Sequence, residues 1–221
     1  ALGPNKVKAA DPAAILLRTR GQVTATPKDG IQPVLVEKGF FCNNAAILST
    51  RTTGMAELRL VHSQTTLALT TQTSLSIRRI DNQGRINENV ELRFGMILVD
   101  APAKDSLTCE IFTPSALVSL KATRALVLYD PASQLTTVYN FEGTARVADV
   151  DFGDWILLEP YGVAYCRSLE RPQCGPIHPQ GLPSLLETVA AVAKLRSPPA
   201  WTCELRLLST DGGRTLPHGD V

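Results

Sequence analysis

The sequence predicts an all-β fold, and three observations carry that prediction. From Gly21 to Cys166, short apolar runs alternate with polar residues, as in strands that bury one face. Turn-forming Gly, Pro, Asn and Asp recur at a spacing of about ten residues. No apolar stripe of helical length lies between them. The clearest strand patterns are Ala56–Leu60, Thr66–Thr70, Leu75–Arg78 and Val90–Phe94.

Two arrangements of short strands fit this pattern, a β-solenoid and a β-sandwich. No cysteine pair brackets a tryptophan as in immunoglobulin-like sandwiches, because Trp155 follows Cys42 and Cys109 late in the β region. Aromatic residues make up only 5% of the chain, and aliphatic layers suit stacked coils. We therefore expect a β-solenoid-like stack, with the sandwich as the alternative.

The chain divides into three parts by composition. Residues 1–14 lack periodicity and predict an extended lead-in, and residues 15–167 form the β domain. Residues 168–221 begin with a proline-rich connection that is predicted not to sustain a strand ladder, since each proline lacks a donor. A capping box of Ser184 and Glu187 then predicts a helix over 184–196, expected to cap the β core, followed by a last strand near Thr202–Leu208.

Composition excludes several classes of function. The chain has 221 residues, 44% of them hydrophobic, enough for a large core without a cofactor. Its net charge of +1 leaves no surplus of cations for phosphates, so we expect no nucleic-acid partner. No apolar run is long enough to span a bilayer, and no signal peptide opens the sequence. We expect any membrane anchor to lie outside this sequence.

Five cysteines bear on the compartment. Cys166 and Cys174 flank a proline-containing stretch where a short disulfide would restrict the unfolded chain, and they are the disulfide candidates. The alternative is that all five are buried thiols that pack as small apolar side chains.

Signatures of enzymes and metal sites are missing from the sequence. The three histidines lie far apart, and no nucleophile elbow, phosphate-binding glycine loop or zinc motif is present. Asp149, Asp151 and Asp154 are the densest group of carboxylates, and they raise two hypotheses: a calcium loop and the acids of a β-helix polysaccharide-active enzyme. The simpler interpretation is a hairpin turn with solvated acids. We predict no cofactor, no metal and no catalytic residue.

Exposed strand faces supply the candidate binding residues. Arginines on the predicted strands would form a basic stripe if the strands stacked in register, although interspersed glutamates favour a solvated face. Late aromatic residues would form a platform for a carbohydrate. The candidate binding residues are Arg59, Arg78, Arg93, Trp155, Tyr161 and Tyr165.

The order of the segments resembles the FecR family, an extracytoplasmic β domain. The matching segments are Arg20–Ala25, Val34–Gly39, Leu48–Thr50, Gly54–Leu60, Val90–Ile97, Phe112–Val118 and Val138–Val147. One departure is Lys121–Leu126, which keeps the threonine of a family step but lacks its glycine and aromatic residue.

This resemblance implies a non-enzymatic, right-handed β-solenoid on the outer side of a bacterial inner membrane. In the best-known members the domain passes a signal from an outer-membrane transporter to a sigma factor. We therefore expect a periplasmic or extracellular module that binds a protein partner at the cell envelope. A glycan- or peptidoglycan-binding module is the alternative, and a polysaccharide-active enzyme is the third.

Overall fold

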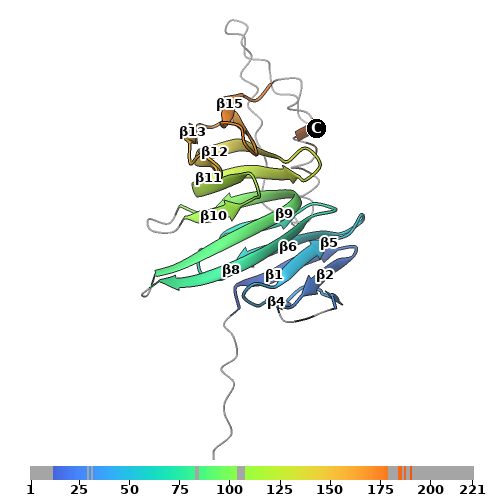
Figure 1. Ribbon diagram of the computed structural model, residues 1–221. Helices are drawn as coiled ribbons and strands as arrows, with labels where there is room; N and C mark the ends of the chain where they lie inside the picture. The colour runs from blue at the N-terminus through green and yellow to red at the C-terminus, as the bar shows by residue number, and fades with distance from the viewer. Residues whose placement is uncertain are drawn as a thin grey trace, which may run out of the picture.

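The computed structural model describes residues 12–28, 30, 32–82, 85–103 and 108–178, together with Ser184, Leu185, Glu187 and Ala190. In this part of the chain, fifteen strands join in one open sheet (Figure 1). They are β1 (Ala14–Arg20), β2 (Val23–Thr26), β3 (Val34–Leu35), β4 (Phe41–Cys42), β5 (Ile47–Thr50), β6 (Met55–Leu60), β7 (Thr66–Leu69), β8 (Ser74–Asn82), β9 (Arg85–Ala101), β10 (Cys109–Phe112), β11 (Ala116–Asp130), β12 (Leu135–Asp149), β13 (Trp155–Leu158), β14 (Gly162–Arg167) and β15 (Gln173–Pro176).

The sheet folds over into two layers because its three long strands each change partners midway. The first half of β9 pairs with β8 and β10, whereas its second half pairs with β7 and β11. The first layer runs in the order β3, β2, β5, β8, β9, β10, β11, β12, β13. The second layer runs β4, β1, β6, β7, β9, β11, β12, β14, β15.

Tight corners mark the places where the long strands pass between the layers. Gly95 in β9 has φ +94° and Gly143 in β12 has φ +70°, backbone conformations that side chains with a Cβ disfavour. A Cβ on Gly143 would lie 2.0 Å from the carbonyl oxygen of Ala122, the residue at which β11 turns. Neighbouring corners therefore stack backbone against backbone.

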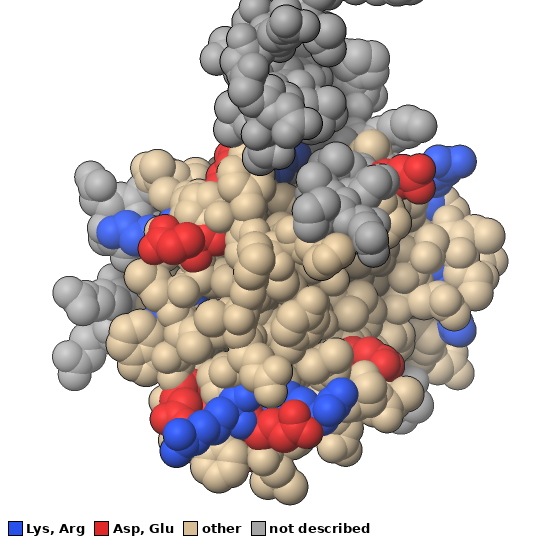
Figure 2. Space-filling model, turned by 90° about the horizontal axis from the view of Figure 1, so that it is seen from above, with Lys and Arg blue, Asp and Glu red and all other residues tan. Residues whose placement is uncertain are grey.

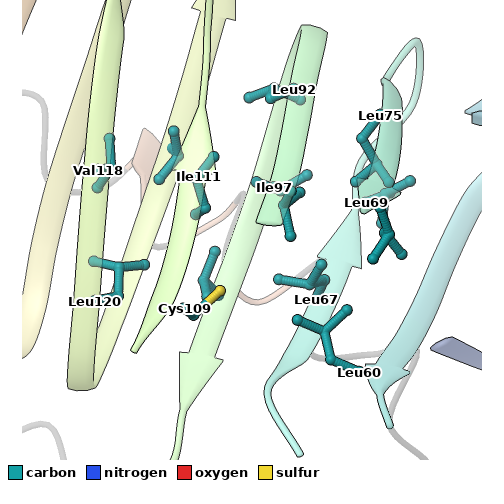
Figure 3. Packing of buried hydrophobic residues seen from close by; sticks show 14 of the residues in the cluster. Leu60, Leu67, Leu69, Leu75, Leu92, Ile97, Cys109, Ile111, Val118 and Leu120 are labelled. Carbon is teal, nitrogen blue, oxygen red and sulfur yellow. The ribbon is translucent and has the colours of Figure 1, made fainter. Parts of the chain in front are cut away.

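One apolar core lies between the two layers. Leu60, Leu67 and Leu69 of the second layer and Leu75 and Leu92 of the first belong to the same buried cluster (Figure 3). Strands β5 and β10 alternate buried and partly exposed residues, as strand geometry requires of a two-layer arrangement, whereas Ala68 between Leu67 and Leu69 is also buried.

The all-β prediction is confirmed, whereas the solenoid is not. Among the described strands every pairing except β9 with β10 is antiparallel, while stacked solenoid coils would run parallel. The long strands fold over as hairpins, and the resulting two layers agree with the sandwich alternative. Similar alternation of buried and exposed residues arises in both folds, so the strand pattern could not separate them.

The C-terminal predictions are described only in part. Ser184, Leu185, Glu187 and Ala190 are helical, within the predicted span 184–196. The lead-in up to residue 11 and the last predicted strand lie outside the described residues, as does Cys203. β15 forms inside the stretch expected to be an irregular connection. It does so as an edge strand, with Pro176 at its end, where a missing N–H costs no ladder bond.

Candidate binding surface

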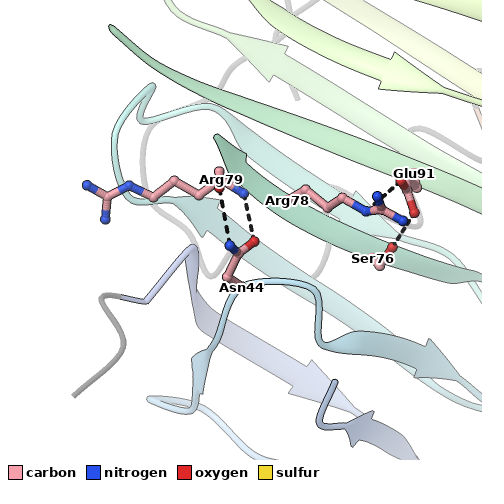
Figure 4. Close-up of polar contacts among 5 residues, drawn as sticks. All are labelled: Asn44, Ser76, Arg78, Arg79 and Glu91. Atoms are coloured by element: carbon pink, nitrogen blue, oxygen red, sulfur yellow. Dashed lines mark hydrogen bonds and ion pairs between the residues drawn. The ribbon is translucent and has the colours of Figure 1, made fainter. Parts of the chain in front are cut away.

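The three candidate arginines do not lie together. Arg59 is on β6 of the second layer, whereas Arg78 and Arg93 are on β8 and β9 of the first. The Nε of Arg78 lies 2.7 Å from Oε1 of Glu91, and Ser76 Oγ donates to Oε2 of the same carboxylate (Figure 4). The charge of Arg78 is therefore balanced within the sheet. These positions do not produce one basic stripe.

The neighbouring Arg79 has a structural role through its backbone. Asn44 Nδ2 donates to the carbonyl oxygen of Arg79, and Asn44 Oδ1 accepts from its N–H (Figure 4). This pair of hydrogen bonds ties the turn before β5 to β8.

The three candidate aromatic residues also occupy different places. Trp155 faces outward from β13 in the first layer, because its neighbour Ile156 packs against the core. Tyr165 faces outward from β14 in the second layer, because Ala164 beside it is buried. Tyr161 lies in the turn between them at φ 62°. Trp155 and Tyr165 are therefore on opposite faces and do not form one platform.

Trp155 belongs instead to an apolar group at the end of the first layer, which we call the β13 surface. Its members are Val150, Phe152, Trp155 and Leu157, and the last three are exposed by 58%, 53% and 54%. The guanidinium of Arg146 on β12 lies 4.3 Å from the centroid of the Trp155 ring, a cation–π contact that orients the indole. Four exposed apolar side chains within eight residues of the chain favour an interaction site in this segment.

The free edge of β13 offers main-chain groups beside these side chains. Asp149 N–H donates to the carbonyl oxygen of Asp154, which fixes the phase of the β12–β13 ladder. Since hydrogen-bonded pairs alternate in an antiparallel ladder, Ile156 and Leu158 face β12. The N–H and C=O groups of Trp155 and Leu157 consequently point away from the sheet.

The sheet has three other edges, and each is protected. β3 and β4 have two residues each, and short edge strands pair poorly with other chains. β15 contains Gly175 and ends in Pro176. β13 has four residues with no Pro, Gly or charge, so it alone among the described edges lacks the usual protection against strand addition. Figure 1 shows β13 and β15 at one end of the sheet and β4 at the other.

The end that carries β13 bears charged residues beside the apolar ones, among them Arg146, Asp154 and Arg171. Seen from there, charged side chains lie around the rim of the molecule, and uncharged residues fill most of the middle (Figure 2).

The three clustered carboxylates serve the fold. Asp149 is buried and accepts a hydrogen bond from the N–H of Phe152. Asp151 accepts from the N–H of Leu169 at 2.7 Å, and Asp154 lies 3.2 Å from Nε of Arg171. In the described part of the chain no group of three or more His, Cys, Asp or Glu side chains is placed to hold a metal ion. The solvated-turn interpretation needs correction at Asp149, because that side chain closes the turn from inside.

The candidate disulfide is not formed in the structure. β14 and β15 pair Ala164 with Cys174, which makes Cys166 a diagonal neighbour of Cys174 at a separation that disulfides rarely bridge. Cys42, Cys109, Cys166 and Cys174 are free thiols. Burial raises the pKa of Cys42 to about 11 and that of Cys109 and Cys166 to about 12. These three thiols therefore stay protonated at neutral pH, and Cys174 is exposed.

Two shallow hollows lie away from the β13 surface. One, of about 400 Å³, lies on the first layer and is lined by Thr24, Thr26, Pro33, Ser49, Thr50, Arg51, Thr52, Gln72 and Phe94. The other, of about 220 Å³, lies beside Tyr165 and is lined by Leu135, Arg167, Glu170, Arg171 and Gln173 as well.

The outer face of the second layer carries its own apolar cluster. Ala68, Leu98 and Leu126 are buried there, and the helical residue Leu185 packs against them. This contact places part of the predicted capping helix on a sheet face, whereas we had expected an end or an edge of the β core.

The sequence indicates Trp155 as an exposed aromatic residue, which the structure confirms, but it does not indicate the apolar residues that accompany it. Val150 and Phe152 stand among three aspartates, and the segment was interpreted through its charges. The alternation of Trp155 and Leu157 was the available signal, but the strand's position at an edge depends on pairings far apart in the sequence.

Comparisons with known proteins agree with the resemblance noted from sequence. Residues 46–146 match the family model described as FecR protein. Two crystal structures, at 1.65 and 2.50 Å, of a candidate anti-sigma factor from Parabacteroides distasonis ATCC 8503 are similar to this chain at 15% identity and a TM-score of 0.52. The similarity covers 63% of this chain and 64% and 63% of those chains, less than two thirds of their length, and it shows a shared fold. No curated protein matches the chain.

Proposed function

We propose that the protein is a regulatory module of the bacterial cell envelope, because residues 46–146 match the FecR family model. In this proposal it lies in the periplasm or outside the cell and transmits a signal by binding another protein. The described residues include no helix that is long and apolar enough to cross a membrane. The description of the two similar structures as a candidate anti-sigma factor supports a signalling role.

The observation that carries the binding role is the exposed β13 surface. Trp155 and Leu157 present apolar side chains on one side of an edge whose main-chain groups point outward. Because Trp155 and Leu157 are about half exposed, a partner that covers them gains about half of the 1.5–3 kcal/mol that burial of a fully exposed large side chain contributes, roughly 1 kcal/mol each. Main-chain pairing adds hydrogen bonds and directs the partner to one register.

Binding accounts for this geometry better than catalysis does. The carboxylates proposed as glycan-cleaving acids accept backbone hydrogen bonds or pair with Arg171. These structural roles favour binding over the polysaccharide-active enzyme.

The glycan-binding alternative finds its support elsewhere on the molecule. The hollow lined by Thr24, Ser49, Arg51 and Phe94 combines hydroxyl groups, a cation and an aromatic side chain exposed by 41%. Such a set suits a sugar ring. Substitutions on β13 would leave that hollow unchanged, so the two functions can be separated by mutation.

A genetic experiment tests the proposed function. In the bacterium that encodes the chain, we expect Trp155→Lys with Leu157→Lys to change the same transcripts as deletion of the gene, because the two charges block the β13 surface. The control is Val34→Lys with Leu35→Lys, which places the same charges on exposed residues of β3. Immunoblots verify equal protein levels.

Specific results of the transcript experiment would contradict the proposed function. The proposal is contradicted if deletion alters no transcripts, or if the β13 double variant behaves as wild type while deletion does not. A control variant that acts as strongly as the β13 variant would equally contradict the assignment to this surface.

A further inference from the structure

The β13 strand is complementary to itself. Its four residues, Trp155 to Leu158, carry no charge, so an antiparallel copy would place no like charges opposite each other. A two-fold interface requires one surface that fits its own copy, and an uncharged edge strand meets that requirement.

We propose that β13 pairs with β13 of a second copy of this chain about a two-fold axis. The first layers of the two molecules then form one continuous sheet. This inference rests on the proposed function, because it uses the same β13 surface. It goes further by naming a second copy of the chain as the protein that binds there.

The phase of the β12–β13 ladder sets the register of the pair. Only Trp155 and Leu157 direct their N–H and C=O groups outward. The register that uses all of these groups pairs Trp155 with the partner's Leu157 and Leu157 with the partner's Trp155. Each of these pairs exchanges both of its main-chain hydrogen bonds, and the two-fold axis passes beside Ile156.

Side chains reinforce this register on both faces. On the outer face each indole lies across from the partner's Leu157, an aromatic–aliphatic pair of the kind that stabilises sheets. Arg146 already holds the indole from the neighbouring strand. On the inner face the half-buried Ile156 meets the partner's Ile156 and loses its remaining exposure to water.

The pairing is expected to be weak. Four residues cover less than the roughly 800 Å² per partner of a standard interface, although Val150 and Phe152 extend the apolar area. We therefore expect a dissociation constant on the order of 10–100 μM, with dimers forming on concentration or on tethering at a membrane surface.

Sedimentation equilibrium of the purified chain tests the proposal. We expect the mass to rise from 23.9 kDa toward twice that value as the concentration increases to about 0.5 mM. Leu157→Lys should weaken the association at least about ten-fold, because it places two cations within one small interface. Leu35→Lys, on the exposed end strand β3, should leave it unchanged.

A second variant distinguishes a loss of pairing from a loss of folding. Trp155→Thr keeps a residue suited to strands but removes the indole, and it should also weaken the dimer while the circular dichroism spectrum stays that of wild type. A chain that remains monomeric at about 0.5 mM overturns self-pairing, as does a dimer that survives both β13 variants. Neither result bears on the transcript experiment, which tests the β13 surface whatever its occupant.

Discussion

Gly143→Ala is expected to destabilise the protein by about 3 kcal/mol or more. The residue has φ +70°, which costs an alanine about 1 kcal/mol, and its new Cβ would lie 2.0 Å from the carbonyl oxygen of Ala122. The corner cannot relax freely, because Asn140 Nδ2 donates to the Gly143 carbonyl and to that of Leu158, both at 2.9 Å. Urea unfolding measures the change in free energy.

Gly153 provides the matched control for this corner. It has φ +73°, but nothing lies within 4 Å of the position a Cβ would take. Gly153→Ala should therefore cost only the backbone term of about 1 kcal/mol. If Gly143→Ala and Gly153→Ala lowered the free energy of unfolding equally, the close approach of the Gly143 and Ala122 corners would not constrain the fold.

Glu88→Ala is expected to cost about 3 kcal/mol or more, because its carboxylate holds the two layers together at another place. Glu88 is 3% exposed on β9, and its two oxygens accept the N–H groups of His62 and Ser63 at 2.8 and 2.7 Å. These donors belong to the turn between β6 and β7. Removing the carboxylate breaks two hydrogen bonds to a charged group, worth about 1.5–3 kcal/mol each, and leaves the buried N–H of Ser63 and the part-buried N–H of His62 without this acceptor.

Two further variants show whether the hydrogen bonds are the cause. Glu88→Gln keeps the shape and one acceptor oxygen, so its loss should be intermediate. Glu142→Ala removes an exposed carboxylate 3.9 Å from Arg124 and should cost less than about 1 kcal/mol. If Glu88→Ala lost no more stability than Glu142→Ala in the same urea titration, the two hydrogen bonds that Glu88 accepts would not contribute measurably to the stability of the fold.

The strands were predictable because their information is local. Leu58, Leu60, Leu67 and Leu69 alternate with other residues in sequence, and the structure buries all four. The two-layer arrangement was not predictable in this way. It depends on corners such as Ala122, a non-glycine residue at φ 50°, whose carbonyl oxygen approaches the backbone of Gly143 so closely that a Cβ there would lie 2.0 Å away.

The residues of the proposed binding surface were likewise predictable only in part. Trp155 was singled out as an exposed aromatic residue, but its grouping with Tyr161 and Tyr165 followed proximity in sequence. The fold places Tyr165 on the other layer, and Leu157 takes its place beside Trp155. Proximity in sequence was a poor guide here because the turn after β13 carries the chain from one layer to the other.

Amide hydrogen exchange at β13 tests the central claim most directly, since the claim is that this edge is open. At low concentration we expect the N–H groups of Trp155 and Leu157 to exchange at least about ten-fold faster than those of Ile156 and Leu158, which bond to β12. Raising the concentration should slow the first pair selectively. Equal protection of all four amides in dilute solution would mean that the edge is already covered, and it would contradict both the proposed binding surface and its pairing with a second copy.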